Sequence, residues 1–234
     1  MRALLLALAG LAACATHSTP APVPAPAPSV LPDPEPEPVD PTARIVAAED
    51  LLIEAPQRAR FIIDSRGAFE SHFVGALVME GARIQITASG RFGDKPVEVA
   101  LDADGTRMRG TGGAQAFDLP QPEGLREALA VGIMRMGLLH TLAMLVAGRP
   151  PDVPEGDVRA WLTLTPDPQA PTVAVMEPHH QDLPPDPITF RGAVAGNESI
   201  TATVWIEEGV LLERQQETRF EGGTMEVREA FEPL

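Results

Sequence analysis

The sequence predicts an α+β fold, in which helices pack on the concave face of one strongly curved antiparallel β-sheet. Three observations lead to this prediction. Apolar and polar residues alternate with a period of two through most of 58–120 and 188–231, glycine-containing turns separate the alternating segments, and one apolar helical stretch interrupts them. A sheet with its helices on one side buries such a set of elements in one core.

The first residues, MRALLLALAGLAAC, have the pattern of an export signal. Arg2 is a short positive region, and residues 3–11 are an apolar stretch too short for a transmembrane helix, which takes about 20 residues. The tetrad Leu11-Ala12-Ala13-Cys14 resembles the lipobox of bacterial lipoproteins. The resemblance implies cleavage before Cys14 and lipidation of its thiol. An ordinary secretory signal that contains a cysteine is the alternative.

This resemblance divides the chain into a signal peptide at 1–13, an acylated cysteine with a tether at 14–41, and a single domain at 42–234. Two or more acyl chains attach a protein stably to membrane lipid. Ala15 follows the cysteine, and by resemblance to enterobacterial lipoproteins this implies sorting to the outer membrane. We therefore expect a lipid-anchored protein of the bacterial cell envelope, with its domain facing the periplasm.

The tether is rich in proline. Residues 19–42 read TPAPVPAPAPSVLPDPEPEPVDPT, with proline at nearly every second position. Such a segment favours the polyproline II conformation and acts as a semi-rigid spacer of about 3.1 Å per residue. We interpret it as a stalk that holds the domain away from the membrane. A proline-rich ligand for a partner protein is the alternative.

Composition excludes several functions. The chain has 18 Lys and Arg residues against 33 Asp and Glu residues, a formal net charge of −15. This charge disfavours nucleic acid as a partner, because binding there depends on basic groups that neutralise phosphates. Apolar residues are 44% of the chain, enough for a core. The single cysteine excludes an intramolecular disulfide framework and a zinc site with several cysteines.

The elements follow in order. Asp40-Pro41 resembles a helix start and Pro56 ends the helical spacing, so we expect a first helix at 42–55. Strands are expected before the apolar insert at 60–64, 68–80, 83–89, 97–102, 106–109 and 116–119. Strands are expected after it at 158–165, 172–176, 188–194, 200–207, 210–220 and 225–231.

The apolar insert at 123–148 predicts one long helix that is apolar nearly all round. Such a helix is buried in a protein or lies in a membrane. Residues 128–148 are long enough to span a bilayer, but Arg135 would cost about 2.5 kcal/mol or more near its centre. A span would also place the strands on opposite sides of the membrane. We therefore expect a helix buried against the concave side of the sheet.

The order of elements resembles the LolA/LolB-like half-barrels, which include periplasmic lipoprotein carriers. The resemblance rests on the leading helix, the strand meander, the apolar insert, and the C-terminal pair formed by the Trp205 strand and the Arg214 strand. It implies an incomplete antiparallel barrel plugged by helices. In that class the apolar cleft between sheet and helices holds acyl chains.

We therefore expect binding of acyl chains of lipids or lipoproteins in an apolar cleft, in lipid or lipoprotein trafficking. The candidate cleft residues all lie on the insert: Met134, Met136, Leu139, His140 and Met144. Methionine adapts to variable partners, although these methionines equally suit a filled core. A structural or interaction lipoprotein with a filled core and no ligand is the main alternative. A metal-dependent enzyme is a weaker one.

No catalytic residue, cofactor or metal site is predicted. The segment 176–182 contains His179 and His180 beside two carboxylates, but its prolines indicate a surface loop, and neighbours on an extended chain face opposite ways. Asp102-Ala103-Asp104-Gly105 resembles the start of a calcium loop but lacks the third acidic ligand and the distant Glu. A hairpin turn accounts for it.

Overall fold

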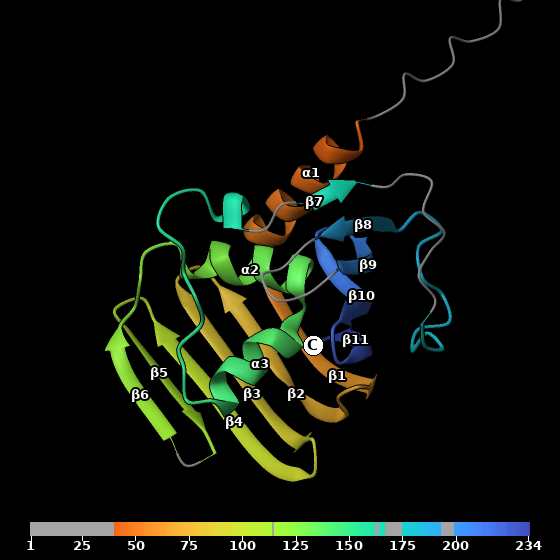
Figure 1. The fold of residues 1–234 in the computed structure, drawn as a ribbon. Helices are drawn as coiled ribbons and strands as arrows, with labels where there is room; N and C mark the ends of the chain where they lie inside the picture. The colour runs from red at the N-terminus through yellow and green to blue at the C-terminus, as the bar shows by residue number, and fades with distance from the viewer. Residues whose placement is uncertain (1–39, 114, 162–163, 167–174, 193–198) are drawn as a thin grey trace, which may run out of the picture. The chain divides into compact units, whose positions relative to one another are not determined.

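The structure is a computed structural model that describes residues 40–113, 115–161, 164–166, 175–192 and 199–234. These residues form an α+β fold with an 11-stranded antiparallel sheet and three α-helices (Figure 1). The predicted class and the large antiparallel sheet are confirmed. The expected signal peptide, Cys14 and most of the tether lie outside the described residues.

The helices are α1 (Pro41–Glu54), α2 (Leu125–Met136) and α3 (Leu138–Val146), and η1 (Val158–Trp161) is a short 3-10 helix. The strands of the first half are β1 (Gln57–Gly67), β2 (Ser71–Glu80), β3 (Arg83–Phe92), β4 (Lys95–Asp104), β5 (Arg107–Gly112) and β6 (Gln115–Pro120). The strands of the second half are β7 (Leu164–Pro166), β8 (Ile188–Gly192), β9 (Ser199–Glu207), β10 (Val210–Phe220) and β11 (Gly223–Pro233).

The strands lie in the order β6-β5-β4-β3-β2-β1-β11-β10-β9-β8-β7. Each half is a meander of sequence neighbours, and the two meanders join where β1 pairs with β11, with Phe61 opposite Phe231. The sheet is not closed, because β6 and β7 are its edges. One continuous sheet therefore carries residues from both halves of the chain to a shared core.

The core is one hydrophobic cluster that joins residues of the sheet with residues of α1, α2 and α3. In β3 the alternation is clear. Ile84, Ile86 and Ala88 are buried, whereas Thr87, which lies between Ile86 and Ala88, is exposed. The α3 helix approaches β5 so closely that a Cβ on Gly112 would lie 1.7 Å from the carbonyl oxygen of Leu145. Only glycine permits this contact between helix end and strand.

The insert differs from the prediction, because it forms two helices rather than one. The helices α2 and α3 meet at Gly137 and are bent by 112° relative to each other. Gly137 has φ +90° and ψ 157°, a conformation that is essentially restricted to glycine. Among the described residues no single helix is long and apolar enough to cross a membrane; only α2 and α3 taken together reach that length and hydropathy.

Two further expectations are corrected. The strand expected at 158–165 begins instead as η1, because Asp157 accepts hydrogen bonds from the backbone N–H of Arg159 and Ala160 and so starts a helical turn. Of the strand expected at 172–176, residues 172–174 lie outside the described residues, and Val175 and Met176 are not in a strand.

The Asp104 turn is confirmed as a hairpin between β4 and β5. Its Oδ1 accepts hydrogen bonds from the backbone N–H of Thr106 and of Arg107, both at 2.9 Å, and from the Thr106 hydroxyl. These donors hold the pKa of Asp104 well below its usual range. The carboxylate is thus occupied by its own turn.

Candidate functional site

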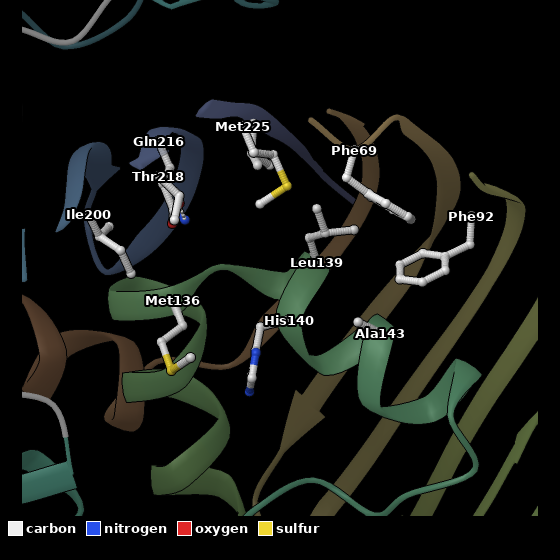
Figure 2. A pocket seen from close by; sticks show the side chains of 11 residues that line it. Phe69, Phe92, Met136, Leu139, His140, Ala143, Ile200, Gln216, Thr218 and Met225 are labelled. Carbon is white, nitrogen blue, oxygen red and sulfur yellow. Dashed lines mark hydrogen bonds between the residues drawn. The ribbon is translucent and has the colours of Figure 1, made fainter. Parts of the chain in front are cut away.

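A cavity of about 190 Å³, partly open to solvent, lies where the break between α2 and α3 faces the sheet (Figure 2). Side chains from both halves of the sheet and from both helices line it. They are Phe69, Phe92, Met136, Leu139, His140, Ala143, Ile200, Gln216, Thr218, Met225 and Val227. A group the size of a water molecule takes up about 30 Å³, so the cavity has room for about six such groups.

The strand wall of the cavity follows from the register of β9, β10 and β11. Thr218 on β10 pairs with Ile200 on β9 and Met225 on β11, and Gln216 pairs with Val227. Paired residues on neighbouring strands point to the same face, so these side chains form one surface toward the helices. Figure 2 shows Gln216 and Thr218 together on one side of Met225, and Leu139 of α3 on its other side.

Two phenylalanines form another wall. Phe69 lies in the turn between β1 and β2, and Phe92 ends β3. Their ring centroids are 4.5 Å apart with an interplanar angle of 55°, and Phe92 also lies 6.3 Å from the ring of Phe73. The tilted arrangement of the two rings is a favourable aromatic contact. Even so, Phe69 and Phe92 are only partly buried. They leave apolar surface open to the cavity.

The five candidate cleft residues divide into two groups. Met136, Leu139 and His140 line the cavity (Figure 2). Met134 is fully buried in the core, and Met144 is half-buried and not among the lining residues. Each group includes residues of both α2 and α3, which are bent by 112° relative to each other at Gly137.

A buried ion pair holds the helix break against the sheet. Arg214 on β10 and Glu229 on β11 are paired in register, and both are 0% exposed. The Glu229 carboxylate accepts hydrogen bonds from the backbone N–H of Leu138 at 3.0 Å and of Leu139 at 2.8 Å. It therefore caps the N-terminus of α3, where helix N–H groups lack partners within the helix.

Arg214 caps the other side of the break. Its Nε donates to the carbonyl oxygen of Met134 and its Nη2 to that of Arg135, both at 2.9 Å, at the C-terminal end of α2. The Arg214 Nη1 and Glu229 Oε2 atoms are 4.0 Å apart. Burial lowers the pKa of Arg214 and raises the pKa of Glu229, because loss of water disfavours both charged forms.

The ion pair extends into the cavity wall. Arg214 Nη2 also donates to Gln216 Oε1, and Gln216 Nε2 donates to Thr218 Oγ1 at 2.5 Å. Gln216 and Thr218 are buried and line the cavity. The polar part of the wall is therefore a hydrogen-bonded row, fixed from behind by a guanidinium group that does not itself line the cavity.

His140 is the sole titratable group among the described residues that line the cavity. Burial lowers its pKa, an effect that Asp152 partly opposes. Asp, Glu, Lys and Arg are absent from the described lining. At neutral pH the cavity wall thus carries no formal charge, which suits an apolar or neutral occupant.

The lowered pKa of His140 predicts a loss of stability in mild acid. As pH falls below about 6.5, His140 takes up a proton in the unfolded chain, while the folded chain resists it until its lower pKa. The unfolded state then binds more protons, so stability decreases with falling pH. We expect the decrease in melting temperature between pH 7 and pH 5.5 to be smaller in His140→Gln. Equal decreases in both proteins contradict this assignment.

Arg135, considered from the sequence as a candidate contact for a lipid head group, is directed away from the cavity. It donates to both carboxylate oxygens of Glu49 on α1, Nε to Oε1 at 2.5 Å and Nη2 to Oε2 at 2.9 Å. Glu49 is fully buried and also accepts from Arg159 Nε at 3.0 Å. The charge of Arg135 in the apolar helix α2 is therefore paired with a buried carboxylate inside the protein.

The histidines of the 176–182 segment also differ from expectation. Their rings are in edge contact, with centroids 5.3 Å apart, because the segment is not extended. The backbone N–H groups of His179 and His180 both donate to Glu213 Oε2, and His179 Nε2 lies 3.2 Å from Glu232 Oε1. Within the described residues there is no group of three or more His, Cys, Asp or Glu side chains suited to a metal ion.

Sequence reasoning missed the strand and aromatic walls of the cavity. Gln216 and Thr218 are polar residues on a strand, and polar strand residues usually face solvent. The available signal was that Arg214, Gln216 and Thr218 alternate along the strand and so share one face of it. Phe69 and Phe92 stand at strand ends, where alternation says little about direction.

A scan against models of known protein families finds no match, and no curated protein matches the sequence.

Proposed function

We propose that this protein is a lipid-anchored envelope lipoprotein whose domain binds an acyl chain in the cavity between the α2–α3 break and the sheet. The observation that carries the proposal is the cavity itself, about 190 Å³, with eight of its eleven described lining residues apolar and none formally charged at neutral pH. Burying apolar area gains about 25 cal/mol per Å². An alkyl chain is the simplest occupant of such a wall.

We propose further that the sheet acts as an incomplete barrel, with the helices packed on its concave face. Support comes from the core, in which residues of β1–β5 and of β8–β11 join one hydrophobic cluster with residues of all three helices. Further support comes from Arg214 and Glu229, which hydrogen-bond the adjoining ends of α2 and α3 to the sheet. The lipobox supports the anchor and the envelope location.

The size of the cavity sets a quantitative expectation. Its volume fits about six methylene-sized groups, so the rest of a long chain must extend through the open side. Each added methylene is expected to improve affinity by about 0.8 kcal/mol until the cavity is full, and by much less beyond that length. A series of fatty acids of increasing length, measured by displacement of cis-parinaric acid, tests this.

The experiment uses the full chain, purified by gentle extraction. Native mass spectrometry looks for co-purifying lipid, and cis-parinaric acid fluorescence measures uptake. Ala143→Phe places a ring in the cavity. It is expected to lower the affinity for cis-parinaric acid by at least about tenfold, which corresponds to roughly 1.4 kcal/mol. Ala147→Phe is the matched control, one helical turn further and exposed. It is expected to bind like the wild type.

Two results contradict the proposal. One is the repeated absence of co-purifying lipid together with no uptake of the probe by the wild type. The other is equal binding by wild type and Ala143→Phe, since the probe then occupies a different place.

A filled core without ligand is the second candidate function, that of a structural or interaction lipoprotein. One observation favours it: about 190 Å³ is less than the roughly 300–1,000 Å³ of most small-molecule sites. This candidate predicts that Ala143→Phe stabilises the protein, because the added ring fills space and displaces nothing. The acyl-chain proposal predicts instead that saturating fatty acid raises the melting temperature of the wild type and not of Ala143→Phe.

A further inference from the structure

The Thr218 hydroxyl is a hydrogen-bond donor in the cavity wall whose direction is set by the residues behind it. Thr218 is 2% exposed, lines the cavity, and accepts a hydrogen bond at Oγ1 from Gln216 Nε2. Whether its own hydrogen is available depends on the orientation of the Gln216 amide, because a glutamine side chain can present either its oxygen or its NH₂ group.

Arg214 fixes that orientation. A guanidinium group has only donors, so the group that it meets on Gln216 must be the amide oxygen. The Gln216 NH₂ group is then the one that faces Thr218. Reversing the amide would place its NH₂ group against the guanidinium, so that two buried donors would face each other without an acceptor.

The hydroxyl of Thr218 is therefore left with a hydrogen to donate. Within the described part of the chain, no acceptor is hydrogen-bonded to it. The hydrogen bonds of the row all run in the same direction, from Arg214 through Gln216 to Thr218. In a chain of hydrogen bonds with one direction, each bond polarises the next, so the last donor becomes stronger. The row ends at a wall that is otherwise formed by apolar neighbours, Ile200 and Met225.

We propose that Thr218 selects the ligand of the cavity, and that the ligand is a neutral acyl ester whose carbonyl oxygen accepts the Thr218 hydrogen bond. This inference rests on the proposed acyl-chain function and narrows it. The uncharged wall favours an ester over a carboxylate, since a charge has no counter-ion there. The alkyl part lies against Leu139, Phe69 and Phe92, and the carbonyl lies against β10.

The test compares two neutral probes of matched length, methyl hexanoate and octane, by displacement of cis-parinaric acid from the full chain. Thr218→Val keeps the shape and removes the hydroxyl. It is expected to lower the affinity for methyl hexanoate about fivefold to tenfold, which corresponds to the loss of one hydrogen bond. The affinity for octane is expected to stay the same or to increase. Thr218→Ser restores the hydroxyl and is expected to restore methyl hexanoate binding.

Thr87→Val is the matched control, because Thr87 is exposed on β3 and does not line the cavity. It is expected to change neither probe. If both probes bind and Thr218→Val alters them equally, or alters neither, the ester assignment is wrong while acyl-chain binding stands. If neither probe nor cis-parinaric acid binds the wild type, both proposals fail. Thr218→Ser, which keeps the donor, separates loss of the hydroxyl from poor folding.

Discussion

Replacing Arg214 by methionine is expected to lower the free energy of unfolding by about 3–5 kcal/mol, because Glu229 then remains buried without its counter-ion. The carbonyl oxygens of Met134 and Arg135 lose their donors in the same change. Urea unfolding followed by circular dichroism measures the effect.

The double variant Arg214→Met/Glu229→Met tests what the pair does. A buried ion pair that only satisfies itself can be replaced by apolar residues at little cost. This pair also caps helix ends, so the double variant leaves the N–H groups of Leu138 and Leu139 without acceptors as well. Each buried unsatisfied group costs about 1–3 kcal/mol. We therefore expect the double variant to stay well below the wild type in stability.

Arg219→Met is the control on the same strand. Arg219 pairs with Glu217 at 2.7 Å, but its side chain is 63% exposed. Exposed ion pairs contribute about 0–1 kcal/mol, so this variant should remain close to the wild type. Full recovery of stability in the Arg214→Met/Glu229→Met protein would show that the helix ends do not depend on the pair.

Glu49→Gln is expected to lower the free energy of unfolding by a similar amount, about 3–5 kcal/mol, because the buried guanidinium of Arg135 loses its anion. The carboxylate joins three elements, since it lies on α1 and accepts hydrogen bonds from Arg135 on α2 and Arg159 on η1. Chemical denaturation measures the loss.

Asp50→Asn is its matched control. Asp50 is the next residue, pairs with Arg159, and is 54% exposed on its side chain. A change of less than about 1 kcal/mol is expected there. Equal losses in Glu49→Gln and Asp50→Asn would mean that burial of the Glu49 carboxylate does not matter.

Much of the fold was predictable because the strands alternate. The strand expected at 210–220 coincides with β10, and the expected helix at 42–55 is displaced by one residue. The strand at 60–64 was predicted too short, since β1 buries two polar residues, Gln57 and Ser65, that break the apolar pattern. Gln57 is satisfied by the carbonyl oxygens of Ala55 and Gly209. A partner as far away in the chain as Gly209 leaves no mark in a local pattern.

The candidate site was predictable only on its helical side. The apolar insert indicates which residues will be buried. Which of them line the cavity depends on the bend at Gly137. That bend was not predictable, because a single glycine inside a helix usually leaves the helix straight. The polar wall required knowing that Arg214 and Glu229 are partners across two strands and that both reach the same helix break. Those relations belong to the tertiary structure.

The pairing of β1 with β11 has a consequence for folding and truncation. Every other pair of neighbouring strands joins segments next to each other in the chain, whereas this one joins the first strand to the last. Closing so long a loop carries a large entropic cost and slows folding. The two meanders therefore join only once β11 is available to pair with β1. A premature stop codon before Gly223 leaves ten of the eleven strands without the seam that unites them.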